Sequence, residues 1–169
     1  MIRDARPEDV PGILSIYGPI VQETEISFES ESPTIDDLTA RVQRSHVWLV
    51  DEDAGAITGY AYAAPFHERA GYRWSVEISV YVDANHQRSG IGRALVEALL
   101  ACLVDMGFVN VFAGVALPNT GSVRLFESLG FEQIALQKEV GFKLGRWIDV
   151  GWWQKHLRER SDPPPELDL

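Results

Sequence analysis

Cysteine is nearly absent from this chain of 169 residues, which contains only Cys102. A single cysteine cannot form an internal disulfide or build a thiolate zinc site, and the histidines lack ligand spacing, so we expect no metal. Long apolar runs are also missing, and none approaches the ~20 residues that span a bilayer. The first ten residues lack the apolar stretch of a signal peptide. We therefore expect a cytoplasmic protein.

Basic residues are in the minority, with 15 Lys and Arg against 25 Asp and Glu, for a net charge of −10. A nucleic-acid-binding protein would show a basic face, so we expect no nucleic-acid partner and no membrane. The segment from Pro7 to Ala40 contains eight acidic residues and no Lys or Arg. Such a segment is typical of a solvated surface, and it would also suit an acidic wall that attracts a cationic amine.

The length predicts one domain, since domains average about 150 residues. Residues 161–169 contain three prolines and three acids, and prolines cannot donate backbone hydrogen bonds. We therefore expect residues 1–160 to form the single domain and residues 161–169 to form a disordered, Pro-rich acidic tail.

Hydrophobic periodicity predicts the element order β-α-α-β-β-β-α-β-α-β-β. The expected strands are 2–5, 47–50, 57–66, 74–82, 109–117, 131–140 and 147–155, with turn residues at 51–55, and the expected helices are 8–22, 35–45, 91–106 and 122–129. Consecutive strands favour antiparallel pairing, whereas the crossover through 91–106 favours a parallel pair. The predicted fold class is α/β, with a mixed central sheet and helices on both faces.

The most informative segment lies between the strand that ends at Val82 and the helix that begins at Ile91. It reads Gln-Arg-Ser-Gly-Ile-Gly over residues 87–92. Glycines permit a close backbone approach, and the free N–H groups of a helix start bind anions. Residues 86–93 also hold two arginines and no acid. The segment therefore predicts a turn that binds a diphosphate.

Two common phosphate motifs do not fit this turn. A Walker-type loop would end in Gly-Lys-Ser/Thr, and a dinucleotide fingerprint would have a third glycine where Leu95 stands. The pattern Gln/Arg-x-x-Gly-x-Gly after a strand fits completely. An ordinary glycine-containing turn would explain the two glycines but not the whole combination of strand, Gln-Arg, glycines and helix.

This turn, preceded by Val-Tyr-Val at 80–82, resembles the acetyl-CoA site of the GCN5-related N-acetyltransferase (GNAT) superfamily. Residues 66–82, 117–131 and 141–150 are similar to the phosphinothricin N-acetyltransferase family, related members of which acylate methionine sulfone or sulfoximine. The resemblance implies the GNAT acyl-CoA N-acyltransferase fold, acetyl-CoA as co-substrate and a homodimer. The cofactor-binding residues that it implies are Val80, Tyr81, Val82, Gln87, Arg88, Ser89, Gly90, Ile91, Gly92, Arg93, Asn119 and Ser122. Asn119 would equally serve as a helix cap.

Glu77 is the expected general base and also a substrate-binding residue. It lies in a strand among apolar neighbours, where burial would raise its pKa toward a useful value, and it matches the catalytic Glu proposed for the family. The alternative is a structural carboxylate paired with Arg69 or Arg73.

The expected acceptor-binding residues are Phe28, Arg69, Tyr72 and Arg73. The arginines and the tyrosine would bind an anionic group by forked hydrogen bonds, although a solvated surface charge also explains Arg73. The resemblance implies a pocket-lining role for Phe28, for which a core role is equally open. His67 stands where the phosphinothricin enzymes have Lys.

Phe126 departs from the family pattern, because many members carry Tyr or His there to protonate the leaving thiolate. Phe has no proton to give, so core packing is the expected role. The preferred function is acetyl transfer to a small amino-acid-like amine. The alternatives are a peptide or polyamine N-acetyltransferase and a non-catalytic acetyl-CoA sensor. The late tryptophans (Trp147, Trp152 and Trp153) either contact a second copy or close the final strands over the sheet.

Overall fold

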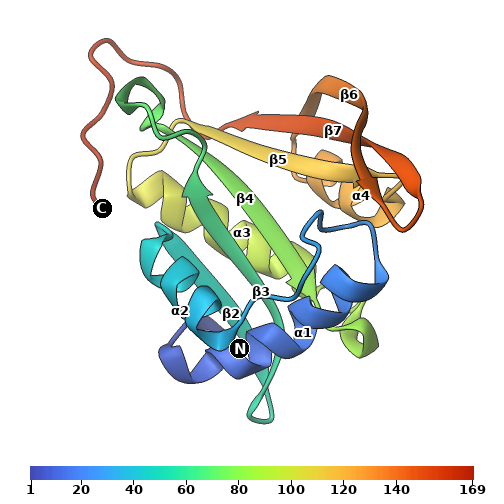
Figure 1. Ribbon diagram of the computed structural model, residues 1–169. Coiled ribbons are helices and arrows are strands. Elements are labelled where there is room, and N and C mark those ends of the chain that lie inside the picture. The colour runs from blue at the N-terminus through green and yellow to red at the C-terminus, as the bar shows by residue number, and fades with distance from the viewer.

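Seven strands form one sheet in the order β1-β2-β3-β4-β5-β7-β6 (Figure 1), and the computed structural model describes residues 1–169. The strands are β1 (Ile2–Asp4), β2 (Val47–Asp53), β3 (Ala56–Pro65), β4 (Ser75–Val82), β5 (Asn110–Leu117), β6 (Glu132–Lys143) and β7 (Arg146–His156). The helices are α1 (Val10–Glu23), α2 (Ile35–Arg44), α3 (Ile91–Asp105) and α4 (Thr120–Ser128), with short 3-10 turns η1 (Pro7–Asp9), η2 (Ala70–Tyr72) and η3 (Ala84–His86). The predicted element order is confirmed.

One boundary differs clearly from the prediction. The turn expected over 51–55 shrinks to Ala54 and Gly55, because β2 continues to Asp53. Both turn residues have positive φ, 48° and 83°, which is the backbone twist that a two-residue hairpin requires. The acidic side chains before the turn therefore belong to a strand.

Only one pair of neighbouring strands is parallel, β4 with β5, and all other pairs are antiparallel. The parallel pair is short, because only residues 75–77 of β4 pair with residues 110–112 of β5. Beyond that point β4 and β5 diverge (Figure 1), while each keeps its antiparallel partner on the other side. The mixed sheet is therefore split along its middle.

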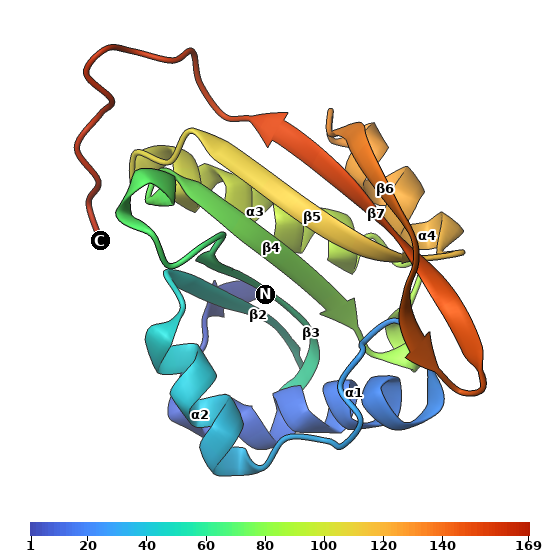
Figure 2. The same ribbon diagram turned by 45° about the horizontal axis from the view of Figure 1, so that its top comes forward.

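Helices cover both faces of the sheet, as predicted. Strand alternation divides the apolar residues: Leu49, Ala61 and Val76 point into a core with α3 and α4, whereas Trp48 and Tyr60 point into a second core with α1 and α2. Figure 2 shows α1 and α2 together on one side of the sheet and α3 on the other. None of these helices combines the length and apolar character of a membrane crossing.

The late tryptophans divide between the two roles that the sequence left open. Trp153 is buried in the main core, whereas Trp147 is 62% exposed. Trp152 lies over Gly114, where an added Cβ would come within 3.2 Å of its ring. Closure over the sheet thus explains Trp152 and Trp153. Trp147 packs edge-on against Phe142 of the same hairpin, with centroids 5.3 Å apart, and stays largely exposed.

Residues of the C-terminal tail contact the domain. It has no helix or strand, but the indole N–H of Trp74 donates to the Pro165 carbonyl at 2.8 Å, and the Asp168 N–H donates to the Met106 carbonyl. Leu167 packs against the main core. Prolines lack N–H donors, but their carbonyls remain acceptors, and this is what the composition did not reveal.

Candidate active site

The turn from β4 into α3 presents free backbone N–H groups. Arg88 and Gly90 have positive φ, 60° and 90°, and this path brings the chain round into α3. The first helical hydrogen bond runs from the Ala94 N–H to the Gly90 carbonyl. The N–H groups of residues 91–93 therefore have no helical acceptor, and they form an anion site with the helix dipole.

The two arginines of this turn have different surroundings. Arg93 forms an ion pair with Glu97 at 2.9 Å and donates to the Ser128 hydroxyl at 3.0 Å. Arg88 is exposed and its side chain has no protein partner. Arg88 is thus the guanidinium that is free to meet a bound anion.

A cleft of about 410 Å³ extends from this turn along β4 and the start of α4. Its lining residues are Ile20, Ile26, Val80, Tyr81, Val82, His86, Gln87, Arg88, Gly90, Ile91, Gly92, Arg93, Asn119, Gly121, Ser122 and Leu125. The cleft thus brings together all the residues expected to bind the cofactor except Ser89. The Ser89 hydroxyl instead donates to the His86 carbonyl, within the turn.

Asn119 caps α4 and also lies in the cleft. Its Oδ1 accepts a hydrogen bond of 3.1 Å from the Ser122 N–H, which caps α4, and the same residue lines the cleft. The Ser122 hydroxyl has no protein partner. The beginning of α4 therefore forms the second wall of the cleft, opposite β4.

The cleft continues into the gap between β4 and β5. A smaller pocket there is lined by Ile26, Ile78, Ser79, Val80, Tyr81, Gly114, Val115, Ala116, Asn119, Ser122 and Phe126. The Asp83 N–H donates to the Thr58 carbonyl of β3, and N–H direction alternates along a strand. The N–H groups of Val80 and Val82 therefore point away from β3, into the gap where β5 has departed. They are donors preorganised for an oxyanion.

Glu77 lies at the point where the gap begins. It forms the last register pair of the parallel ladder, with Phe112. Burial raises the pKa of the Glu77 carboxyl above its usual value, and the carboxylate forms no ion pair. The alternative of a structural pair with Arg69 or Arg73 does not occur. A half-buried, unpaired carboxylate with a raised pKa is suited to accept a proton near neutral pH.

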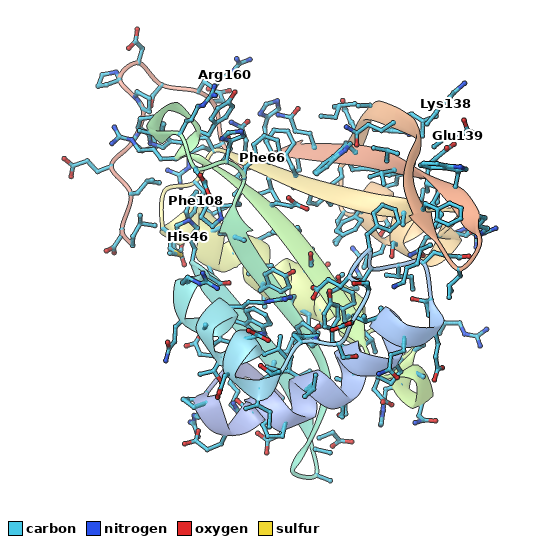
Figure 3. The ribbon with its side chains drawn as sticks, viewed as in Figure 1. His46, Phe66, Phe108, Lys138, Glu139 and Arg160 are labelled. Carbon is cyan, nitrogen blue, oxygen red and sulfur yellow. The ribbon has the colours of Figure 1, made fainter.

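An aromatic cluster flanks Glu77. The ring of Phe66, labelled in Figure 3, stacks on Phe112 with centroids 4.3 Å apart and contacts Trp152 edge-on. Tyr72, on η2, lies 6.2 Å from Phe66 and stacks on His67 at 4.8 Å. The cluster begins at Phe112, the register partner of Glu77, and extends through Phe66 to Tyr72.

The other residues expected to bind the acceptor lie in different surroundings. Phe28 packs on β6, where an added Cβ at Gly141 would come within 2.4 Å of its ring. Arg73 holds its guanidinium 4.2 Å from the Trp74 ring. Arg69 is exposed, with no protein partner for its side chain. Only Tyr72 is linked to the surroundings of Glu77, through its ring contacts with Phe66 and His67.

Phe126 is buried in the main core, where it packs edge-on against Phe131 with centroids 5.2 Å apart. It also closes the inner end of the gap. The expected core role fits this placement, and the aromatic ring offers no proton at that point.

Three of the eight acids between Pro7 and Ala40 form ion pairs. Glu29 accepts a bidentate pair from Arg41 at 2.6 and 2.9 Å, and Glu25 accepts one from Arg146 at 2.6 and 2.8 Å. Asp9 accepts two hydrogen bonds from Arg3. These carboxylates are structural, so they do not form a free acidic wall for a cationic amine.

Several residues that line the cleft were not predicted from the sequence. Leu125 lies one turn of α4 beyond Ser122, so helical spacing from Ser122 was a usable signal for it, and Gly121 precedes Ser122 in the first turn of the same helix. Ile20 and Ile26 come from α1 and the segment after it. No local pattern links that segment to β4, because tertiary packing alone brings them together.

Comparisons with known proteins agree with this geometry. Residues 2–152 match the family model described as an acetyltransferase (GNAT) domain. The chain is 39% identical to phosphinothricin N-acetyltransferase of Streptomyces viridochromogenes, covering 97% of this chain and 91% of that one. It is 35% identical to L-methionine sulfoximine/L-methionine sulfone acetyltransferase of Salmonella typhimurium, covering 96% and 97%. A structure from Salmonella typhimurium with its cofactor acetyl-CoA superposes with a TM-score of 0.92 at 34% identity, covering 95% of each chain.

Proposed function

Because the chain belongs to the GNAT acetyltransferase family and is an acetyl-CoA-dependent N-acetyltransferase, we propose that its acceptor is the α-amine of a small amino acid. The acceptor class is that of phosphinothricin, methionine sulfone or methionine sulfoximine. The amine attacks directly, with Glu77 as general base. The observation that carries this proposal is the unpaired, half-buried carboxylate at the point where β4 and β5 part.

Two independent features of the cleft suit the cofactor. The free N–H groups at the start of α3, with Arg88, suit its diphosphate, and the gap between β4 and β5 admits an extended arm. Acetyl-CoA supplies an activated acetyl thioester when bound. The N–H groups of Val80 and Val82 would hold the carbonyl oxygen as negative charge develops on it.

Glu77 would hold the amine proton on a carboxylate oxygen. An ammonium group cannot attack, so a base must first remove a proton, and burial brings the pKa of Glu77 closer to neutral pH. Phe126 offers no acid for the departing sulfur. We assign that proton to water, because a thiolate is a good enough leaving group to depart before it is protonated.

The surroundings of Glu77 favour an anionic or zwitterionic acceptor over a cationic one. The nearby side chains are aromatic, Tyr72 supplies a hydroxyl, and Arg69 has an uncommitted guanidinium on the same segment. Glu25 and Glu29, two of the acids that could attract a polyamine, are already in ion pairs. His67 stacks on Tyr72 and adds a further donor to this side of the site.

A thiol-release assay tests the proposal. The purified chain is mixed with acetyl-CoA and, in turn, phosphinothricin, methionine sulfone, methionine sulfoximine, spermidine and a lysine-containing peptide. We expect thiol release with the three amino-acid-like acceptors and little with the last two. Preference for spermidine or the peptide would refute the acceptor assignment, and no release with any amine would refute the activity.

We further propose that two copies pair through the β6–β7 hairpin. Six large apolar side chains there are at least 46% exposed: Ile134, Leu136, Val140, Phe142, Leu144 and Trp147. β6 is also the last strand of the sheet, and an exposed apolar edge is otherwise prone to aggregate. Light scattering should give the mass of two chains, and Trp147→Glu should shift it toward one. A wild-type monomer at micromolar concentration would refute the pairing.

A further inference from the structure

The tip of the β6–β7 hairpin lies beside the segment that follows α1, although more than a hundred residues separate them in the sequence (Figures 1 and 2). The turn is made by Leu144 and Gly145, with φ of 49° and 81°, so the two strands continue to its very end. Lys143 and Arg146 flank this turn. Both side chains reach back to residues 21–27.

Lys143 binds two backbone carbonyls. Its ammonium donates to the Val21 carbonyl and to the Ser27 carbonyl, each at 2.5 Å. Val21 lies in the last turn of α1, where carbonyls have no helical donor and the helix dipole is negative. A cation at this place both satisfies an orphan carbonyl and opposes the dipole. Because the second bond goes to Ser27, the same ammonium fixes how the chain leaves the helix.

Arg146 and Gly141 add two contacts to the same segment. Arg146 donates through Nε and Nη2 to the two carboxylate oxygens of Glu25. Gly141 has no side chain, and the ring of Phe28 occupies the space that a Cβ would need. The hairpin therefore holds residues 25, 27 and 28 by three different kinds of contact.

The segment so held forms part of the site. Ile26 lies between these contacts, and it lines both the cofactor cleft and the gap between β4 and β5. The buried Ser27 hydroxyl is bonded to the Tyr17 hydroxyl at 2.8 Å, and the Tyr17 ring packs on Tyr81, another lining residue. A shift of this segment would thus move two walls of the cleft at once.

We propose that Lys143 and Arg146 form a clasp that positions residues 24–28 as a wall of the acetyl-CoA cleft. Lys143 is a positioning residue, since it touches the wall and no reacting group. This inference rests on the proposed function only for its kinetic consequence. The contacts themselves are a property of the folded chain.

The test compares Lys143→Met with Lys138→Met. Lys138 lies on the same strand, is exposed and has no protein partner, and Figure 3 shows it pointing outward. Arg146→Met is the second variant, because its pair with Glu25 is partly exposed and its loss is compatible with folding. For each variant, hydrogen exchange is measured at residues 24–31, together with acetyl-CoA KM and kcat.

We expect Lys143→Met to speed exchange at residues 24–31 and to lower kcat/KM for acetyl-CoA by about tenfold, through loss of two charge-assisted hydrogen bonds. Arg146→Met should act in the same direction but less strongly, Lys143→Arg should restore much of the loss, and Lys138→Met should match the wild type. Unchanged exchange would overturn the clasp. Faster exchange with unchanged kinetics, or uniformly faster exchange over the whole chain, would overturn its positioning role.

Failure of the proposed function would look different. If the wild type acetylated no amine, the exchange measurement and calorimetric titration with coenzyme A would still judge the clasp. Faster exchange confined to residues 24–31 and weakened coenzyme A binding in Lys143→Met would then support the clasp without the proposed function. Wild-type values of both measurements would overturn the clasp.

Discussion

Replacement of Glu77 by Gln separates a catalytic carboxylate from a structural one. The substitution keeps the shape of the side chain and removes both its ability to accept a proton and its negative charge. A positioned general base contributes about 10²–10⁴-fold to the rate, so kcat should fall within that range. The dissociation constant for acetyl-CoA should stay the same, because the anion site lies at the start of α3 and does not include this residue.

The stability of the same variant should rise at neutral pH. Burial raises the pKa of Glu77 above its usual value of 4.5, so the folded chain binds this proton more tightly than the unfolded chain does. The contribution of Glu77 to stability is therefore present below pH 4.5 and is lost as pH rises to the raised value. Above that window a buried charge without a partner opposes folding, and Gln removes it.

A structural carboxylate would behave in the opposite way. Breaking a buried ion pair costs about 3–5 kcal/mol, and Glu77 has no ion pair to break. Thermal unfolding at pH 7.5 and thiol release from pH 5 to 9 measure both effects. Wild-type activity should climb through the raised pKa, and Glu132→Gln, at an exposed site on β6, should change neither readout. A Glu77→Gln variant that loses stability but keeps its activity would refute the assignment.

Three further substitutions have defined outcomes. Gly90→Ala places a Cβ on a residue with φ +90°, where no atom lies within 4 Å of it, so the cost comes from the backbone conformation alone. About 1–2 kcal/mol of stability should be lost in urea unfolding. A smaller loss would contradict the backbone geometry. Arg88→Gln should weaken coenzyme A binding by calorimetry about tenfold without changing the melting temperature, since Arg88 has no protein partner. Trp74→Phe removes the hydrogen bond to Pro165 and should lower the free energy of unfolding by about 1 kcal/mol. Hydrogen exchange at residues 162–169 should become faster. Unchanged exchange there would show that the bond does not hold the tail.

Local patterns were sufficient to predict the element order and the anion-binding turn. A helix start with two glycines and free N–H groups is a property of a few consecutive residues, so residues 87–92 could be interpreted without knowing their neighbours in space. The same holds for the alternation that buries Val76 and Ile78 and leaves Glu77 on the other face. Periodicity reports which face a side chain takes, whatever packs against it.

Composition was less informative about the termini and about the acidic segment. The prolines of residues 161–169 suggested disorder, but Leu167 and the Pro165 carbonyl find partners on the body of the domain. The acids before Ala40 were compatible with a solvated surface or an acidic wall, and Glu25 and Glu29 meet arginines that lie far along the chain or on another helix. A charge count cannot show which charges are paired.

The sequence by itself determined the order of strands and helices, the glycine-containing turn at the start of α3 and the face of β4 that carries Glu77. These depend on interactions within a few residues, where the period of the chain and the conformational freedom of glycine decide the outcome. Only the tertiary structure decided that β4 and β5 part after a three-residue ladder, that Trp153 is buried while Trp147 is exposed, and that Lys143 holds the end of α1. These depend on which distant segments come to share a surface, and no local pattern encodes that choice.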